Sequence, residues 1–176
     1  LPFDGMAIGG SFGARRGTRA QPGLRKDEMV ETIKWIVPYL PEDKPRHLLG
    51  IGKIRDVFNA VEQGMDLFDC VIPTREARHG RIYTKHGHFD VSKYKNKKTP
   101  LEKGCKCPVC RKKITRAKLY ELFKNPDKTL AQRYATIHNV WFFNNLLEDI
   151  RLSIKNGKFK SFKDRFLKRF KFQSFL

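Results

Sequence analysis

The stretch of the chain that decides its fold is residues 65–80, with the sequence MDLFDCVIPTREARHG. Its first half contains the apolar run from Leu67 to Ile72, which predicts a short strand covered on both faces. Asp69 interrupts that run, and a carboxylate inside a buried strand is costly unless a partner or a reaction uses it. Pro73 then ends the strand, because proline cannot donate to a ladder of hydrogen bonds.

The second half of the stretch places two cations after the acid. Arg75 and Arg78 follow Asp69 on what we expect to be a basic exit loop. An acid at the carboxyl end of a parallel strand, facing such a loop, is how an α/β enzyme presents a catalytic group. The alternative is that Asp69 caps a turn or pairs with Arg75.

The residues before this stretch alternate between strand and helix patterns. We expect strands over residues 3–10 and 47–52, and amphipathic helices over residues 25–40 and 54–63, because apolar residues recur at the matching spacing. Gly64 is expected to cap the second helix. The order β-α-β-α-β with short loops predicts an α/β fold with a parallel sheet and right-handed crossovers.

The residues after the stretch favour a hairpin and several helices. We expect the hairpin strands over residues 81–84 and 88–91, and helices over residues 116–123 and 130–155. A last helix over residues 158–172 has phenylalanines at helical spacing. We expect this phenylalanine stripe to pack on the body, with the cationic remainder facing solvent or RNA.

Composition restricts the class of protein. The chain has 176 residues, 40% of them hydrophobic, and a net charge of +19. This is a globular composition with a field that indicates a polyanionic partner, nucleic acid above all. A ribosome-like or merely soluble basic surface is the alternative. We expect no membrane span, no signal peptide and a reducing, cytoplasmic location. The absence of an initiator Met suggests the carboxyl-terminal part of a longer protein.

Three of the four cysteines crowd into the segment CKCPVC, at Cys105, Cys107 and Cys110. A disulfide framework does not explain three thiols on one tight loop, whereas a soft cation does. Zn²⁺ takes four tetrahedral ligands, so a fourth ligand must come from elsewhere in the chain. A closed set of this kind would be structural, with no open position for catalysis.

The fourth ligand is not fixed by spacing. His138 lies inside the predicted long helix, where a histidine is usually a hydrogen-bonded core residue. A three-cysteine site that lacks a fourth ligand makes His138 a stronger candidate for that ligand. His79, His86 and His88 stay open as alternatives. Cys70 lies in the predicted buried strand and is a poor candidate.

These motifs together resemble a known family. In order they are Gly9-Gly10 after a strand, HLLGIG at residues 47–52, FDCVIPTR at residues 68–75, CKCPVC at residues 105–110 and IHN at residues 137–139. They closely resemble the carboxyl-terminal half of bacterial-type tRNA-guanine transglycosylases, also called queuine tRNA-ribosyltransferases. The resemblance implies the carboxyl-terminal part of a (β/α)8 TIM barrel with an inserted zinc-binding subdomain. The expected parts are residues 1–80 with the catalytic strand, 81–145 with the zinc subdomain, and 146–176 with basic helices.

The resemblance also implies an activity. This family of glycosyltransferases (pentosyltransferases) exchanges guanine at the wobble position of tRNA with a GUN anticodon for a 7-deazaguanine, preQ1 or queuine. Asp69 would be the nucleophile that forms a covalent ribosyl-enzyme, and Arg75 and Arg78 would grip the neighbouring anticodon bases. Gly10, Ser11 and Leu49 would contact the purine, and Cys105, Cys107, Cys110 and His138 would hold zinc. Whether the chain forms a homodimer is left open.

The chemistry is consistent with these residues. Replacing one purine by another on the same face of the ribose needs two displacements, with one attacking carboxylate and a second group that manages protons. Asp66 is three residues from Asp69, so strand alternation sends it to the other face. The family's second aspartate lies in the amino-terminal half, and three strands cannot close a barrel. We therefore expect the chain alone to be inactive. The rival hypothesis is a non-catalytic, zinc-stabilised tRNA-binding half-barrel or partner subunit.

Overall fold

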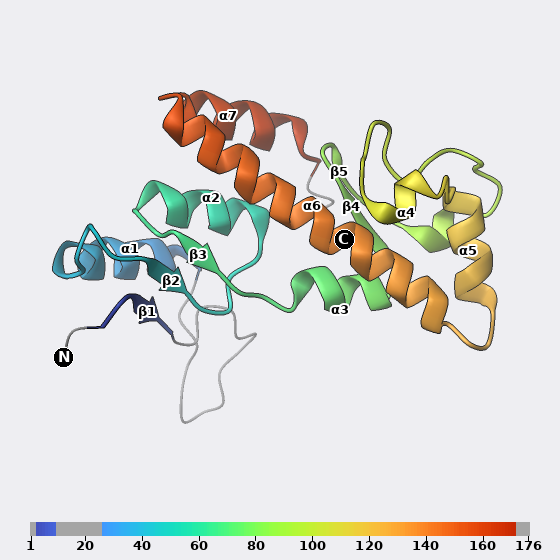
Figure 1. Cartoon of the computed structure of the whole chain (residues 1–176), viewed down its shortest axis with the longest axis horizontal. Coiled ribbons are helices and arrows are strands. Elements are labelled where there is room, and N and C mark those ends of the chain that lie inside the picture. Colours follow the sequence, from blue (N-terminus) through green and yellow to red (C-terminus); the bar gives the residue numbers. More distant parts are fainter. Residues whose placement is uncertain (1–2, 10–25, 172–176) are drawn as a thin grey trace. The chain divides into compact units, whose positions relative to one another are not determined.

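The computed structural model describes residues 3–9 and 26–171 (Figure 1). The chain divides into two compact units, residues 1–71 and residues 72–176. The expected purine contacts of Gly10 and Ser11 lie outside the described residues. The expected domain boundaries at residues 80 and 145 stay a prediction.

The first unit contains a three-stranded parallel sheet in the order β1-β2-β3. In its register Met6 pairs with Arg46, and His47 with Leu67. This confirms the predicted strand and helix order and the parallel sheet. The elements are β1 (Met6–Ile8), α1 (Lys26–Ile36), η1 (Val37–Tyr39), β2 (Arg46–Leu48), α2 (Ile54–Glu62) and β3 (Leu67–Phe68).

The core of this unit lies on the helical side of the sheet. Leu48 of β2, Ile33 of α1 and Phe58 of α2 are fully buried. Alternation along the strands sends the neighbouring side chains to the opposite face. There Leu49 is 38% exposed and Leu67 is 42% exposed. Within the described residues this second face carries no covering layer.

The predicted strand covered on both faces is therefore wrong. β3 has only two residues, and Val71, which the apolar run places inside the strand, is 59% exposed. Ile72 begins α3 (Ile72–Arg78), so the expected basic exit loop is a helix. Pro73 explains the change, because a proline in the first turn of a helix lacks an N–H that would have no helical partner there.

The second unit is arranged along one long helix, α6 (Thr129–Lys155). Figure 1 shows α3, the hairpin and α5 beside its first half, and α7 beside its second half, and each of these contacts α6. The hairpin is antiparallel, with Arg81 paired to Asp90. The elements are β4 (Arg81–Thr84), β5 (Gly87–Asp90), η2 (Val91–Lys93), α4 (Pro108–Arg111), α5 (Arg116–Lys124) and α7 (Phe159–Arg169).

Burial in this unit follows the apolar pattern of the sequence. Ile82, Leu101 and Leu119 are fully buried in one cluster with the small residues of α6. Phe166 and Phe170 are 3% exposed, which confirms that the phenylalanine stripe of α7 packs on the body. None of the helices in the described part of the chain has the length and apolarity that a membrane crossing requires.

Candidate functional site

The three cysteines and one histidine of the second unit form a single cluster. The ligand atoms of Cys105, Cys107, Cys110 and His138 all lie within 4.8 Å of one another. The Nδ1 atom of His138 is 4.0, 3.5 and 3.6 Å from the three sulfurs in chain order. Among the described residues, the structure thus gathers His138, and not the other histidines considered, with the cysteines.

The local backbone of residues 105–110 explains why the sulfurs converge. The Cys105 sulfur accepts the backbone N–H of Cys107 at 3.5 Å. Cys107 is the N-cap of α4, and its sulfur accepts the backbone N–H of Cys110 at 3.3 Å. These bonds turn both sulfurs inward, and Pro108 begins the helix in the position that proline favours.

His138 is held in the orientation that a metal ligand needs. Its Nε2 atom lies 2.9 Å from the backbone carbonyl oxygen of Tyr83 on β4. A carbonyl can only accept, so Nε2 carries a hydrogen, and Nδ1 is the ring nitrogen that faces the sulfurs. The side chain is fully buried. Three thiols and one imidazole nitrogen in this arrangement fit a closed tetrahedral Zn²⁺ site.

The clustering also changes proton affinities. The hydrogen bond from Cys110, opposed by burial and aided by His138, lowers the pKa of Cys107 to about 3. The same hydrogen bond raises the pKa of the Cys110 thiol. Burial lowers the pKa of His138, but hydrogen bonds with Cys105 and Cys107 outweigh it and raise this pKa to about 10. In the metal-free cluster these shifts favour a thiolate on Cys107 and a protonated imidazole on His138, so metal binding would release protons.

The carboxylate of Asp69 is held by one of its two oxygens. Its Oδ1 atom accepts the backbone N–H of Gly50 at 3.0 Å, and the Nε2 atom of His47 lies 3.4 Å from the same oxygen. The His47 contact does not meet the geometry of a hydrogen bond. Oδ2 has no partner among the described residues, and the side chain is 61% exposed. One oxygen is thus fixed while the other is available.

The second nearby acid has a different role. Asp66 accepts the backbone N–H of Arg46 through Oδ2 at 2.9 Å, and its own N–H donates to the Arg46 carbonyl at 2.9 Å. Its carboxylate is therefore engaged in holding β2 to the chain before β3. This agrees with the expectation that Asp66 does not act together with Asp69.

The remaining predicted residues are exposed. Leu49 lies on the open face of the sheet, and a Cβ on Gly9 would come within 3.1 Å of its Cδ1 atom. Glycine at position 9 therefore leaves room for Leu49. Arg75 and Arg78 lie on the exposed side of α3, three residues apart and hence on one helix face.

Sequence reasoning missed the structural role of Asn139. This residue is fully buried, and its Oδ1 accepts the backbone N–H of Tyr83 at 3.0 Å. Its Nδ2 donates to the carbonyls of Pro73 at 3.1 Å and Arg81 at 2.9 Å. Asn139 thus joins α3, β4 and α6. The contact of His47 with Asp69 was also missed. Its only sequence signal is strand alternation, which puts the His47 side chain on the same face as Leu49.

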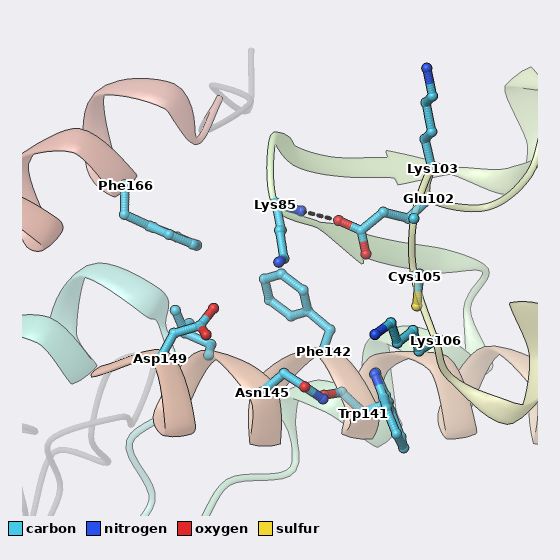
Figure 2. Close-up of a pocket in the computed structure, with 12 residues that line it drawn as sticks. Lys85, Glu102, Lys103, Cys105, Lys106, Trp141, Phe142, Asn145, Asp149 and Phe166 are labelled. Atoms are coloured by element: carbon cyan, nitrogen blue, oxygen red, sulfur yellow. Dashed lines mark hydrogen bonds between the residues drawn. The ribbon is translucent and has the colours of Figure 1, made fainter. Parts of the chain in front are cut away.

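A pocket of about 220 Å³ lies in the second unit, beside the cysteine–histidine cluster (Figure 2). Phe142, Leu146 and Phe166 supply apolar surface, and Cys105 forms part of the lining. The charged residues around the pocket are Lys85, Lys103, Lys106, Glu102 and Asp149. Glu102 accepts the backbone N–H of Lys85 at 2.7 Å through its Oε1 atom. This bond fixes the segment just before the cysteines against the hairpin.

Comparison with known proteins decides the family. The family model described as queuine tRNA-ribosyltransferase matches residues 1–171. The chain belongs to this family. A queuine tRNA-ribosyltransferase from Clostridium perfringens is 42% identical over 165 residues, which are 93% of this chain and 40% of that protein. One from Clostridium acetobutylicum is 40% identical over 170 residues, 96% of this chain and 42% of that protein.

A third queuine tRNA-ribosyltransferase, from Clostridium botulinum, is 39% identical over 170 residues, with 42% of its length covered. The chain therefore spans about two-fifths of the length of the curated relatives that it matches. Family membership confirms the resemblance inferred from the motifs. The individual roles of Asp69, Leu49, Arg75 and Arg78 remain predictions.

Proposed function

We propose that this chain is the carboxyl-terminal part of a tRNA-guanine transglycosylase. The complete enzyme would replace guanine at the wobble position of tRNA with a GUN anticodon by a 7-deazaguanine, preQ1 or queuine. The observation that carries the proposal is the carboxylate of Asp69, with Oδ1 bound to Gly50 and Oδ2 available on an open sheet face. Family membership supplies the substrate class.

The reaction consists of two displacements at C1′ of the ribose. Oδ2 of Asp69 attacks C1′, the glycosidic bond breaks, and guanine leaves with a proton from a general acid. The incoming 7-deazaguanine then attacks C1′ through its ring nitrogen, the ester to Asp69 breaks, and the proton on that nitrogen passes to the same group acting as base. Two inversions retain the configuration. The target base must leave its stack to be reached, so anticodon contacts are required.

We assign the other residues to support this step. Arg75 and Arg78 would contact the anticodon bases beside the wobble position, and Leu49, with Gly10 and Ser11, would contact the purine. Zn²⁺ held by Cys105, Cys107, Cys110 and His138 would cross-link the loop of residues 105–110 to α6 as a structural metal. The general acid and the remaining strands of a (β/α)8 barrel would come from the part of the family protein that this chain does not span.

The rival function is a non-catalytic, metal-stabilised tRNA-binding half-barrel or partner subunit. It is favoured by the three-stranded sheet, which leaves one face open. It is also favoured by Asp66, the acid nearest to Asp69 in sequence, whose carboxylate is engaged with the Arg46 backbone. The two hypotheses differ in whether Asp69 reacts once the barrel is complete.

The test is to trap the ribosyl-enzyme. The chain is combined with the amino-terminal three-fifths of the Clostridium perfringens relative and incubated with tRNA without an acceptor base. We expect a denaturant-resistant protein–RNA adduct that Asp69→Asn abolishes, with tRNA affinity and metal content retained. Asp43→Asn, an exposed change of the same charge, should keep the adduct. The proposal fails if Asp69→Asn keeps the adduct, or if the isolated chain exchanges guanine as fast as the combined protein.

A further inference from the structure

Helix α7 presents a strongly cationic surface that the catalytic proposal does not use. From residue 155 to residue 171 the chain carries eight lysines and arginines and one acid, Asp164. Phe166 of α7 lines a pocket together with Phe142 and Leu146 of α6. It is buried and stacks on Phe170, the buried C-cap residue, at 5.8 Å between ring centroids. The cations are therefore displayed on the outer side of a helix that is fixed by its apolar side.

The carboxyl end of α7 is also fixed by polar contacts to the hairpin. Arg169 donates from Nε to the Lys85 carbonyl at 3.2 Å, and the Lys171 N–H donates to the His86 carbonyl at 3.1 Å. A Cβ on Gly87 would come within 2.7 Å of the Lys171 carbonyl oxygen, so this approach requires glycine. These contacts join the cations of α7 to Lys85 on the rim of the pocket in Figure 2.

Three exposed cations of α7 have no acidic partner in the part of the chain that the structure describes. Lys160, Arg165 and Lys168 are exposed, and among the described residues none of them has an ion-pair partner. Lys160 and Lys168 are eight residues apart, or about 12 Å along the helix axis. Three such cations over this length can contact several successive phosphates of a nucleic-acid strand.

The kind of partner that fits α7 depends on whether its apolar side chains are exposed. A membrane-surface helix needs a free apolar face, and the phenylalanines of α7 are instead packed on α6. A protein interface has an apolar centre, and no large apolar side chain of α7 is exposed within the described range. A polyanionic backbone is the partner that requires neither.

We propose that the outer face of α7 contacts the phosphate backbone of the tRNA. This contact supplies affinity that does not depend on the anticodon sequence, and it positions the RNA while α3 reads the bases. The proposal rests on the proposed function for the identity of the RNA. It assigns to α7 the sequence-independent part of recognition, which phosphate contacts provide.

The test uses the 176-residue chain and two tRNA transcripts, one with a GUN anticodon and one without. The variant Lys160→Gln, Arg165→Gln, Lys168→Gln is compared with a control that loses the same charge from the first unit, Lys34→Gln, Lys44→Gln, Lys53→Gln. The α7 variant should bind both tRNAs at least about tenfold more weakly at about 0.1 M salt, and its slope of log affinity against log salt should fall by about two to three. The control should change both quantities far less. Circular dichroism and metal content establish that both variants are folded.

Three results would overturn the proposal: equal losses in the α7 variant and the control, a loss confined to the GUN tRNA, or competition by phosphatidylglycerol vesicles that depends on the α7 cations. Retention of affinity by Lys160→Arg, Arg165→Lys, Lys168→Arg would support charge as the cause. Because the readout is binding, a failure of guanine exchange leaves this result intact. A negative result here likewise leaves the role of Asp69 intact.

Discussion

The imidazole of His138 and the backbone carbonyl of Tyr83 are joined by a hydrogen bond of 2.9 Å between elements that are 55 residues apart in sequence. This bond determines which nitrogen of His138 carries hydrogen. It also ties β4 to the same helix that faces Cys105, Cys107 and Cys110. The cysteine–histidine cluster and the hairpin are therefore parts of one framework.

The first prediction concerns the metal. The purified chain should contain about one equivalent of Zn²⁺, because three thiols and a correctly oriented imidazole form a closed site. His138→Ala should lose the metal and lower the melting temperature of the second unit, since the binding free energy of a structural metal contributes to folding. His79→Ala is the matched control and should keep both. A folded chain without metal, or metal loss in His79→Ala alone, would disprove this assignment.

The second prediction concerns Asn139. Asn139→Ala leaves the buried N–H of Tyr83 without its partner and removes two further hydrogen bonds, to the half-buried carbonyls of Pro73 and Arg81. At about 1–3 kcal/mol for an unsatisfied buried group and about 1 kcal/mol for each further hydrogen bond, we expect a loss of roughly 3 kcal/mol. Urea unfolding followed through Trp141, with Trp35 replaced by phenylalanine, measures it.

Asn145→Ala is the control for that experiment. Among the described residues its side chain donates only to the Trp141 carbonyl, from an exposed position. The expected change is within about 0.5 kcal/mol. Similar losses in both variants would show that the buried bonds of Asn139 contribute little.

The third prediction concerns α3. Arg75→Ala and Arg78→Ala should reduce the preference of the chain for GUN tRNA more than its overall tRNA affinity. Removing the hydrogen bonds of an arginine to a base lowers discrimination by about 1–3 kcal/mol, or roughly tenfold to a hundredfold. Competition binding between tRNAs that differ in one base beside the wobble position measures the preference. Arg133→Ala, an exposed arginine of α6, should leave it unchanged; a loss equal to that of Arg75→Ala would refute the assignment.

The fourth prediction concerns pH. Burial, aided by the charge of Arg81 and opposed by that of Glu76, lowers the pKa of His88 below its ordinary value of 6.5. The unfolded chain then binds more protons than the folded chain, so this residue favours folding above about pH 6.5, and that contribution is lost as pH falls through the folded-state pKa. In His88→Gln, the decline of the unfolding free energy between about pH 7 and 5 should be shallower. An unchanged slope would show that His88 does not cause it.

Sequence patterns predicted the elements whose signals are local. The apolar spacing of α2 places Val57, Phe58 and Val61 on one side of the helix. The structure buries Val57 and Phe58, and Val61 is half-buried. The cysteine spacing likewise predicted that Cys105, Cys107 and Cys110 converge. His138 was favoured only because a fourth ligand was needed, since nothing local distinguishes it from a core histidine.

Features that depend on register or on distant partners could not be predicted. Pro73 is compatible with the end of a strand and with the first turn of a helix, and the apolar run before it suits either structure, so the sequence favours a loop where the structure has α3. Asp69 is held by Gly50, 19 residues earlier. That contact follows from the pairing of β2 with β3, which the sequence does not specify. The bonds of Asn139 likewise depend on how α6 packs.

The spacing of residues along helix α6 sets the positions of its neighbours in the second unit. His138 faces the cysteines, Asn139 binds α3 and β4, and Phe142 and Leu146 line the pocket that Phe166 of α7 also lines. One residue inserted between His138 and Phe142 would rotate everything beyond it by about 100° and advance it by about 1.5 Å. The stretch from residue 138 to residue 146 should therefore tolerate exchanges of side chain far better than any change of length.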